Sequence, residues 1–310
     1  MNSVYNFIKD NHVIAVVENA YEKRSSTLNL AKYELFEIPE LVTKCTHLMK
    51  LYLNHNEIKY ISENFENLSH LLVLTLDYNH LDEYPKVLNK LTSLRFLNVS
   101  CNVIKTLPNE IGHLTHLETF WCNNTGLLSI PEEIGNCEEL DTFEAQMAHI
   151  RVQQNKSAPK GFEALDNLVH LNLKNNFIDK FPECLTKIKS LRFVFLNENR
   201  ITDASIHRSL LENTDFITVL DLTDNPCAFC DSFVILAEDF THVVLTKEQI
   251  SSLEGIDGVI EDDELENRSD WENSVETSDI NSTDDEDDEQ NLDDISLLIP
   301  QMSRFITSFN

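Results

Sequence analysis

The chain is poor in glycine, poor in basic residues, and has no long apolar run. Only 6 of its 310 residues are glycine, and no glycine-rich loop of the kind that holds phosphates is present. No stretch approaches the ~20 apolar residues that cross a bilayer, and residues 1–24 lack the pattern of a signal peptide. With 24 Lys and Arg against 53 Asp and Glu, the net charge is −29. Because phosphates bind basic side chains, this charge argues against nucleic acid and anionic membranes as direct partners.

The cysteines predict neither a disulfide framework nor a metal site. There are seven, an odd number, and they are scattered, which is typical of free thiols in a reducing cytoplasm or nucleus. Cys227 and Cys230 form a CxxC pair, but no second pair follows and the nearest histidine, His242, stands alone. No nucleophile motif or distinct carboxylate pair is found. We therefore predict no catalytic residue, no metal and no cofactor.

What the chain does contain is a leucine repeat. Each unit reads leucine, two variable residues, apolar, one variable, apolar, two variable and asparagine. Leu48, Leu71, Leu94, Leu117 and Leu140 follow one another at intervals of 23 residues. A period in this range indicates a solenoid, because each unit is too small to bury its own apolar face and buries it against its neighbours.

The spacing within a unit predicts its local structure. The apolar residues at alternate positions are typical of a short strand. The asparagine suits the turn that follows, since its amide can bond backbone groups there. A proline in one constant phase then predicts the start of a helical turn, as in the segments 109–114 and 132–137. The prolines of this phase are Pro39, Pro85, Pro108, Pro131 and Pro182.

This LxxLxLxxNxLxxLP pattern resembles the leucine-rich repeat family over about residues 25–226. The text at Leu107–Leu117, LPNEIGHLTHL, is similar to the 23-residue class of intracellular scaffolds of the Ras-suppressor and Scribble type. The resemblance implies an α/β fold, a right-handed curved solenoid. Its parallel sheet would line the concave face, and short helices or 3-10 turns would line the convex face.

The repeat predicts four segments. These are an N-terminal cap at 1–24, about nine repeats at 25–226, a C-terminal cap at 227–258, and an acidic tail at 259–310. The ends need caps because terminal repeats otherwise expose the core.

The first unit is degenerate, with Tyr33 in the place of the asparagine, and the fifth and sixth units also depart from the pattern. Thr125 and Ala148 stand where the asparagine is expected, and we expect the adjacent Asn124 to shift into the role in the first case. The sixth unit is longer than the others, and its surplus near Gln153–Gly161 predicts a surface loop.

The variable residues of the strands are expected to project from the concave face. Solvent-facing strand positions are usually polar, yet several here are aromatic. An exposed aromatic cluster is typical of an interaction surface, and Trp121 near the middle of the array is the strongest single candidate. The predicted partner-binding residues are Tyr52, Tyr78, Phe96, Trp121, Phe193 and Phe195.

The composition changes near the C-terminus. Between Glu261 and Asp294 there are 17 acidic residues and one basic residue, Arg268, which predicts disorder. The chain is apolar again at Ile295–Phe309, which fits either a short motif for a partner or a strip that folds back on the solenoid. Three residues have an acidic residue three places on and are candidate phosphorylation sites: Ser269, Ser282 and Thr283.

These features predict a non-enzymatic adaptor or scaffold, cytoplasmic or nuclear, that binds a protein partner on its concave face. The charge favours basic partners. An alternative is capture of histones or other basic proteins by the tail, because repeats followed by an acidic tail also resemble the acidic leucine-rich nuclear phosphoprotein family. That family has fewer repeats and a longer, more purely acidic tail. A third reading is a substrate receptor of a ubiquitin ligase, although no F-box is found.

Overall fold

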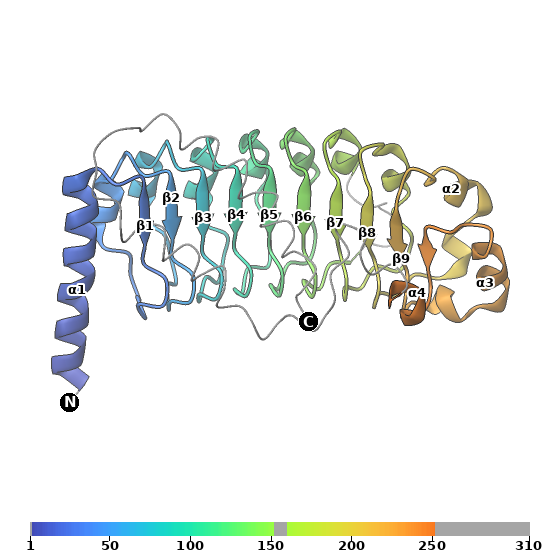
Figure 1. Ribbon diagram of the computed structural model, residues 1–310, viewed down its shortest axis with the longest axis horizontal. Helices are drawn as coiled ribbons and strands as arrows, with labels where there is room; N and C mark the ends of the chain where they lie inside the picture. The colour runs from blue at the N-terminus through green and yellow to red at the C-terminus, as the bar shows by residue number, and fades with distance from the viewer. Residues whose placement is uncertain (1, 152–159, 252–310) are drawn as a thin grey trace. The chain divides into compact units, whose positions relative to one another are not determined.

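The computed structural model describes residues 2–151 and 160–251. It contains one parallel sheet, and short helical turns connect each strand to the next. The ten strands are hydrogen-bonded in the order of the sequence, without crossovers, and lie side by side in Figure 1. This arrangement confirms the predicted α/β solenoid. The strands are β1 (Thr27–Asn29), β2 (Lys50–Tyr52), β3 (Val73–Thr75), β4 (Phe96–Asn98), β5 (Thr119–Trp121), β6 (Thr142–Glu144), β7 (His170–Asn172), β8 (Phe193–Phe195), β9 (Val219–Asp221) and β10 (Val243–Val244).

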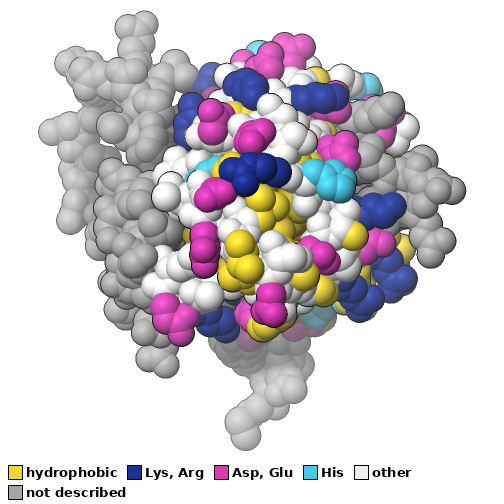
Figure 2. Space-filling view, turned by 90° about the vertical axis from the view of Figure 1, so that its right-hand side faces the viewer, with side chains coloured by type: hydrophobic (Ala, Val, Ile, Leu, Met, Phe, Trp, Pro, Cys, Tyr) yellow, Lys and Arg dark blue, Asp and Glu magenta, His cyan; other side chains and the backbone are white. Residues whose placement is uncertain are grey.

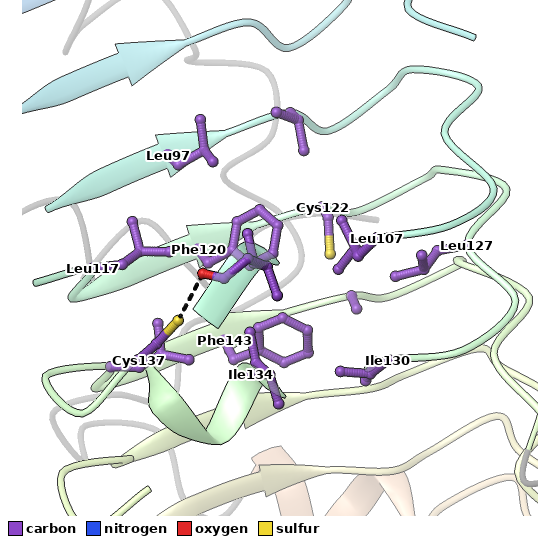
Figure 3. Close-up of a cluster of buried hydrophobic side chains, with 14 of the residues drawn as sticks. Leu97, Leu107, Leu117, Phe120, Cys122, Leu127, Ile130, Ile134, Cys137 and Phe143 are labelled. Atoms are coloured by element: carbon purple, nitrogen blue, oxygen red, sulfur yellow. Dashed lines mark hydrogen bonds between the residues drawn. The ribbon is translucent and has the colours of Figure 1, made fainter. Parts of the chain in front are cut away.

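The middle residue of each long strand forms the core. Leu97 in β4, Phe120 in β5 and Phe143 in β6 pair in register and are completely buried. Figure 3 shows these side chains stacked on one another, with the Cys137 thiol directed at the carbonyl oxygen of Ile111, 3.5 Å away. Each unit thus buries its apolar residues against the units on either side, as the period requires.

One short helical turn returns the chain behind each strand, as the proline phase predicts. Several of these turns begin directly after a proline, which lacks the N–H that a first turn leaves without a partner. The 3-10 turns are η1 (Glu40–Lys44), η2 (Glu63–Asn67), η3 (Lys86–Lys90), η4 (Asn109–His113), η5 (Glu132–Asn136), η6 (Lys160–Ala164), η7 (Glu183–Lys187), η8 (Asp203–Ser205) and η9 (Pro226–Phe229).

Glycine lets two of these turns approach closely. A Cβ atom on Gly135 in η5 would lie 2.2 Å from the carbonyl oxygen of Gly161 in η6. No other residue fits there without moving backbone, so the glycine sets the spacing of this pair of turns.

Buried asparagines connect each unit to the preceding one. The Asn102 side chain accepts the N–H of Leu81 at 3.0 Å, and its Nδ2 lies 2.9 Å from the Leu76 oxygen and 3.0 Å from the Val99 oxygen. Without these amides the turn would leave buried backbone groups unpaired. The same arrangement, hereafter the asparagine ladder, is repeated by Asn56, Asn79, Asn176, Asn199 and Asn225.

The ladder is interrupted where the sequence departs from the pattern. Thr125 Oγ1 donates to the Cys122 oxygen at 3.0 Å, whereas the methyl group of Ala148 has no polar atom. Asn124 does not shift into the role, contrary to the prediction: its side chain is exposed and its Nδ2 lies 3.7 Å from the sulfur of Cys101. The backbone of Asn124 is left-handed, φ 49°, which directs the side chain away from the core.

Helices lie at both ends of the strand array. Helix α1 (Asn2–Lys23) stands beside β1 (Figure 1) and buries Val13, Val17 and Ala20. At the other end are α2 (Arg208–Glu212), α3 (Asp231–Ala237) and β10, a strand that the sequence did not predict. Figure 2 shows apolar side chains near the middle of this end face, ringed by charged ones; Phe229 and Ile235 are exposed apolar residues of η9 and α3.

The chain divides into two units, Met1–Leu245 and Thr246–Asn310. Of the second, the structure describes the helix α4 (Lys247–Ser251). The predicted tail segments, including Ser269, Ser282 and Thr283, and most of the predicted loop near Gln153–Gly161 lie outside the described residues.

Candidate functional site

The concave face is built from the first and third residues of strands β2 to β9. Because side chains alternate along a strand, these residues point away from the core that the middle residues form. The parallel register then places equivalent residues of neighbouring units side by side. The first row is Lys50, Val73, Phe96, Thr119, Thr142, His170, Phe193 and Val219, and the second is Tyr52, Thr75, Asn98, Trp121, Glu144, Asn172, Phe195 and Asp221.

Aromatic side chains of neighbouring units pack on one another at this face. Phe96 and Trp121 meet edge to face, with ring centroids 5.0 Å apart and an interplanar angle of 78°. Histidines complete two stacked pairs, His170 with Phe193 at 4.6 Å and His55 with Tyr78 at 4.4 Å. Both arrangements are favourable for ring quadrupoles. Four of the six predicted aromatic residues therefore lie in pairs that join adjacent units.

The prediction that all six aromatic residues are exposed is wrong for most of them. The side chains of Tyr52, Phe96, Trp121 and Phe193 are 7%, 1%, 7% and 8% exposed. Tyr78 is 36% exposed and Phe195 is half-buried. Strand spacing explains part of the difference, because residues of one row are only ~4.8 Å apart and large rings cover their neighbours. Tyr78 and Phe195 are the predicted residues that solvent reaches most readily.

A buried carboxyl group lies in the second row beside Trp121. Glu144 pairs in register with Trp121 and Asn172 and is completely buried. Its Oε2 accepts a hydrogen bond from Asn123 Nδ2 at 2.7 Å, yet burial outweighs this bond and raises the pKa of the carboxyl to about 8. Glu144 is therefore largely protonated near neutral pH. It lies in a concave row that the sequence predicted, but its acidity did not distinguish it in so acidic a chain.

Two further titratable groups of the face are shifted by burial. Burial lowers the pKa of His170 to about 4, so the ring that stacks on Phe193 is neutral. Burial also raises the pKa of Asp221 to about 6, although the Thr223 N–H donates to its Oδ1 at 2.9 Å. Near neutral pH Asp221 still carries its charge, so Glu144 is the group of these three whose charge state burial changes.

The cysteines and histidines are dispersed over the part of the chain that the structure describes. All seven thiols are free, and no group of three or more potential ligands is positioned to hold a metal ion in that part of the chain. Burial raises the pKa of Cys227 to about 12, which disfavours the reactive thiolate at the CxxC pair. None of the helices described is both long and apolar enough to cross a membrane.

Residues 73–224 match the family model described as a leucine-rich repeat region. The chain carries a leucine-rich repeat region. A comparison with curated proteins found no match. Among solved structures, the chain is similar to two internalins of Listeria monocytogenes. It shares 22% identity and a TM-score of 0.57 with inlF, covering 74% of this chain and 59% of that one. With inlC2 the values are 19% and 0.54, covering 71% and 80%.

A third similar structure is the leucine-rich repeat ectodomain of the Arabidopsis thaliana receptor kinase GASSHO1/SCHENGEN3, solved in complex with CASPARIAN STRIP INTEGRITY FACTOR 2. The identity is 24% and the TM-score 0.52, and the match covers 64% of this chain and 27% of that chain. At this level of identity the likeness concerns the leucine-rich repeat fold. The chain spans 59% of inlF and 27% of the receptor structure.

The sequence did not predict one cluster of polar and aromatic side chains on the leucine-rich repeat solenoid. Arg151 and Arg200 both lie over the ring of Phe177, and His149 stacks on the same ring. Phe177 and Arg200 each directly follow an asparagine of the ladder. Aligning that position across the units is the signal that could have found them.

Proposed function

We propose that this leucine-rich repeat protein is a non-enzymatic adaptor that binds a protein partner on its concave face. The observation that carries the proposal is the set of aromatic side chains that pack on one another across neighbouring units, among strand residues that are mostly uncharged. Trp121 and Phe96 lie at its centre, and the more accessible Tyr78 and Phe195 lie to either side. Aromatic anchors held rigidly in a weakly charged surface are typical of protein interfaces.

In this proposal the accessible and the buried aromatic residues have different roles in contacting the partner. Tyr78 and Phe195 make first contact because solvent reaches them, and the paired rings of Phe96 and Trp121 form the apolar floor. Recognition then depends on side chains fixed by the solenoid, so little ordering entropy is lost on binding. We also propose that the protein lies in the cytoplasm or the nucleus, because its seven free thiols fit a reducing compartment. Fractionation of cells tests this location.

The test compares two double variants of the full chain by proximity labelling in cells. Tyr78→Ala/Phe195→Ala removes the two accessible aromatics of the predicted partner-binding set, and Phe36→Ala/Tyr60→Ala removes two exposed aromatics that do not belong to this set. We expect the first variant to lose specific neighbours that the second retains. Circular dichroism establishes that both are folded. If the first variant keeps every neighbour of the unmodified chain, the concave face is not the binding surface.

A second candidate function is capture of basic proteins by residues 261–310. The run Asp284–Gln290 and the excess of acidic residues around it favour this function. Deleting 261–310 should then abolish binding to histones at physiological salt while leaving the concave-face neighbours in place. Histone binding that survives the deletion contradicts this second function.

A further inference from the structure

A second surface of the solenoid lies just beyond the asparagine ladder. The residue after each ladder position and the residue two places further on are exposed in most units, while the apolar residue between them is buried. Backbone bonds hold neighbouring units together here: the Arg151 N–H donates to the Leu128 oxygen at 3.2 Å, and the Arg200 N–H to the Ile178 oxygen at 2.8 Å. Side chains at these two positions therefore form rows, as those of the strands do.

In the sixth to eighth units these rows bring cationic groups around one phenyl ring. The Cζ atoms of Arg151 and Arg200 lie 5.2 Å and 4.4 Å from the centroid of Phe177. His149 stacks on the same ring at 5.6 Å with an interplanar angle of 12°. His149, Arg151 and Arg200 are exposed and Phe177 is half-buried. We refer to these four residues as the arginine cluster.

Within residues 2–151 and 160–251 the two guanidinium groups have no acidic partner. Although the chain has 53 acidic residues, neither Arg151 nor Arg200 forms an ion pair among the described residues. Asp179, the acidic residue between them in sequence, is exposed and makes no such pair either. A guanidinium that lies over a ring keeps its N–H donors, which lie in its own plane, free to meet a carboxylate through two parallel bonds.

Apolar side chains continue the surface toward the N-terminus. Leu128 precedes Arg151 in its row, and Lys105 precedes Leu128; Val103 lies in the adjacent row. Leu128 and Val103 are both exposed. The surface thus combines basic groups with apolar ones, and apolar contact gives affinity where exposed ion pairs alone give little.

We propose that the arginine cluster and Leu128 bind an acidic peptide segment of a partner protein. Carboxylates of the segment pair with Arg151 and Arg200, and an apolar side chain of the segment packs on Leu128 and the edge of Phe177. A short peptide suits this surface better than nucleic acid does. A polyanion would extend past the cluster onto a chain of net charge −29, whereas repulsion of a short segment is screened beyond ~8 Å at physiological salt.

The experiment measures fluorescence anisotropy of the full chain with a fluorescein-labelled peptide in which Glu and Leu alternate. A peptide with Gln in place of Glu is the charge control. The variant Arg151→Glu/Arg200→Glu removes the site. Lys59→Glu/Lys44→Glu is the control with the same change of net charge, because both lysines are exposed and Lys59 holds the position of Arg151 in an earlier unit. We expect the Arg151→Glu/Arg200→Glu variant to bind at least about tenfold more weakly than the Lys59→Glu/Lys44→Glu variant, a difference that loss of two charge-assisted contacts readily produces.

Further arms separate the possible outcomes. The variant Arg151→Lys/Arg200→Lys keeps both charges but lacks the planar fork, and weaker binding by this variant supports recognition by guanidinium groups. Three results would overturn the proposal. The Glu and Gln peptides could bind equally, a single-stranded oligonucleotide could bind more tightly than the Glu peptide, or the Arg151→Glu/Arg200→Glu and Lys59→Glu/Lys44→Glu variants could bind the peptide equally. The variant Tyr78→Ala/Phe195→Ala should leave peptide binding unchanged, so failure here is distinct from failure of the concave-face proposal.

Discussion

Replacing Asn102 with alanine tests whether the asparagine ladder stabilises the solenoid. The Asn102 amide is buried and bonds backbone groups of two successive units. Its Oδ1 is the acceptor for the N–H of Leu81, and its Nδ2 is a donor for the oxygens of Leu76 and Val99. Alanine at this position removes every one of these bonds without disturbing the strands.

The expected loss follows from counting the groups that lose their partner. The Leu76 oxygen keeps a bond from Asn79 Nδ2 at 3.0 Å, so the substitution leaves it paired. The Leu81 N–H and the Val99 oxygen lose the bond that Asn102 makes with each of them. A buried backbone group left without a partner costs about 1–3 kcal/mol, so we expect the loss of two partners to lower the free energy of unfolding by roughly 2–6 kcal/mol.

Equilibrium urea denaturation, followed by circular dichroism, measures this difference. The matched control is Asn64→Ala, which removes an exposed asparagine side chain from the turn η2. A surface change of this kind should stay within about 0.5 kcal/mol. If Asn102→Ala is no less stable than Asn64→Ala, the amide bonds do not hold the units together and the reasoning fails.

Three further predictions concern stability. Ala148→Asn restores a ladder amide in the sixth unit, so the free energy of unfolding, measured in urea, should rise by about 1 kcal/mol. A lower free energy of unfolding would mean that the site is too crowded for the larger side chain. Gly135→Ala should lose about 1–3 kcal/mol, since its Cβ meets a backbone oxygen. Gly126→Ala, whose nearest neighbour is a side-chain carbon at 3.4 Å, should be nearly neutral. Burial raises the pKa of Glu144 from 4.5 to about 8, so the native state retains a proton that the unfolded state releases, and its contribution to stability falls as pH rises through this window. Between pH 5 and pH 9, urea titrations should therefore show a smaller loss of stability for Glu144→Gln than for the unmodified chain. The exposed control Glu110→Gln should lose as much as the unmodified chain. If the stability of Glu144→Gln falls with pH in parallel with that of the unmodified chain, the assignment is contradicted.

The sequence was sufficient for the strands of the nine repeats, for the turns that begin after a proline and for the core between them. Period and alternation together give each residue a position in its unit, and the position decides whether it is buried in the core. Leu97, Phe120 and Phe143 share one such position and stack as expected. Proline phase was equally informative, because a residue without an N–H fits the first turn of a helix better than any position inside a strand.

Properties that depend on distances between rows were not predictable from the period. The period says that Trp121 projects from the sheet, but its burial depends on the size of Phe96 in the next strand and on what else lies nearby. Strand β10 was missed because the segment after Pro226 carries no asparagine-marked copy of the repeat. The pKa of Glu144 depends on the same burial, which no single unit determines.

The interruption of the ladder falls in the same units as the candidate binding residues. Thr125 and Ala148 remove the ladder amide from the fifth and sixth units, and other side-chain bonds connect these units: Asn123 Nδ2 donates to Glu144 Oε2 at 2.7 Å, and Asn123 Oδ1 accepts the Gln146 N–H at 2.9 Å. Those units also contain Trp121 and Glu144 on the concave face and Arg151 in the arginine cluster. Residues retained for stability follow the repeat, whereas departures that lower stability are expected where a different requirement acts on the chain. Restoring asparagine at position 148 should raise stability, and under the concave-face proposal a loss of neighbours in proximity labelling by this variant would show that the irregularity serves binding.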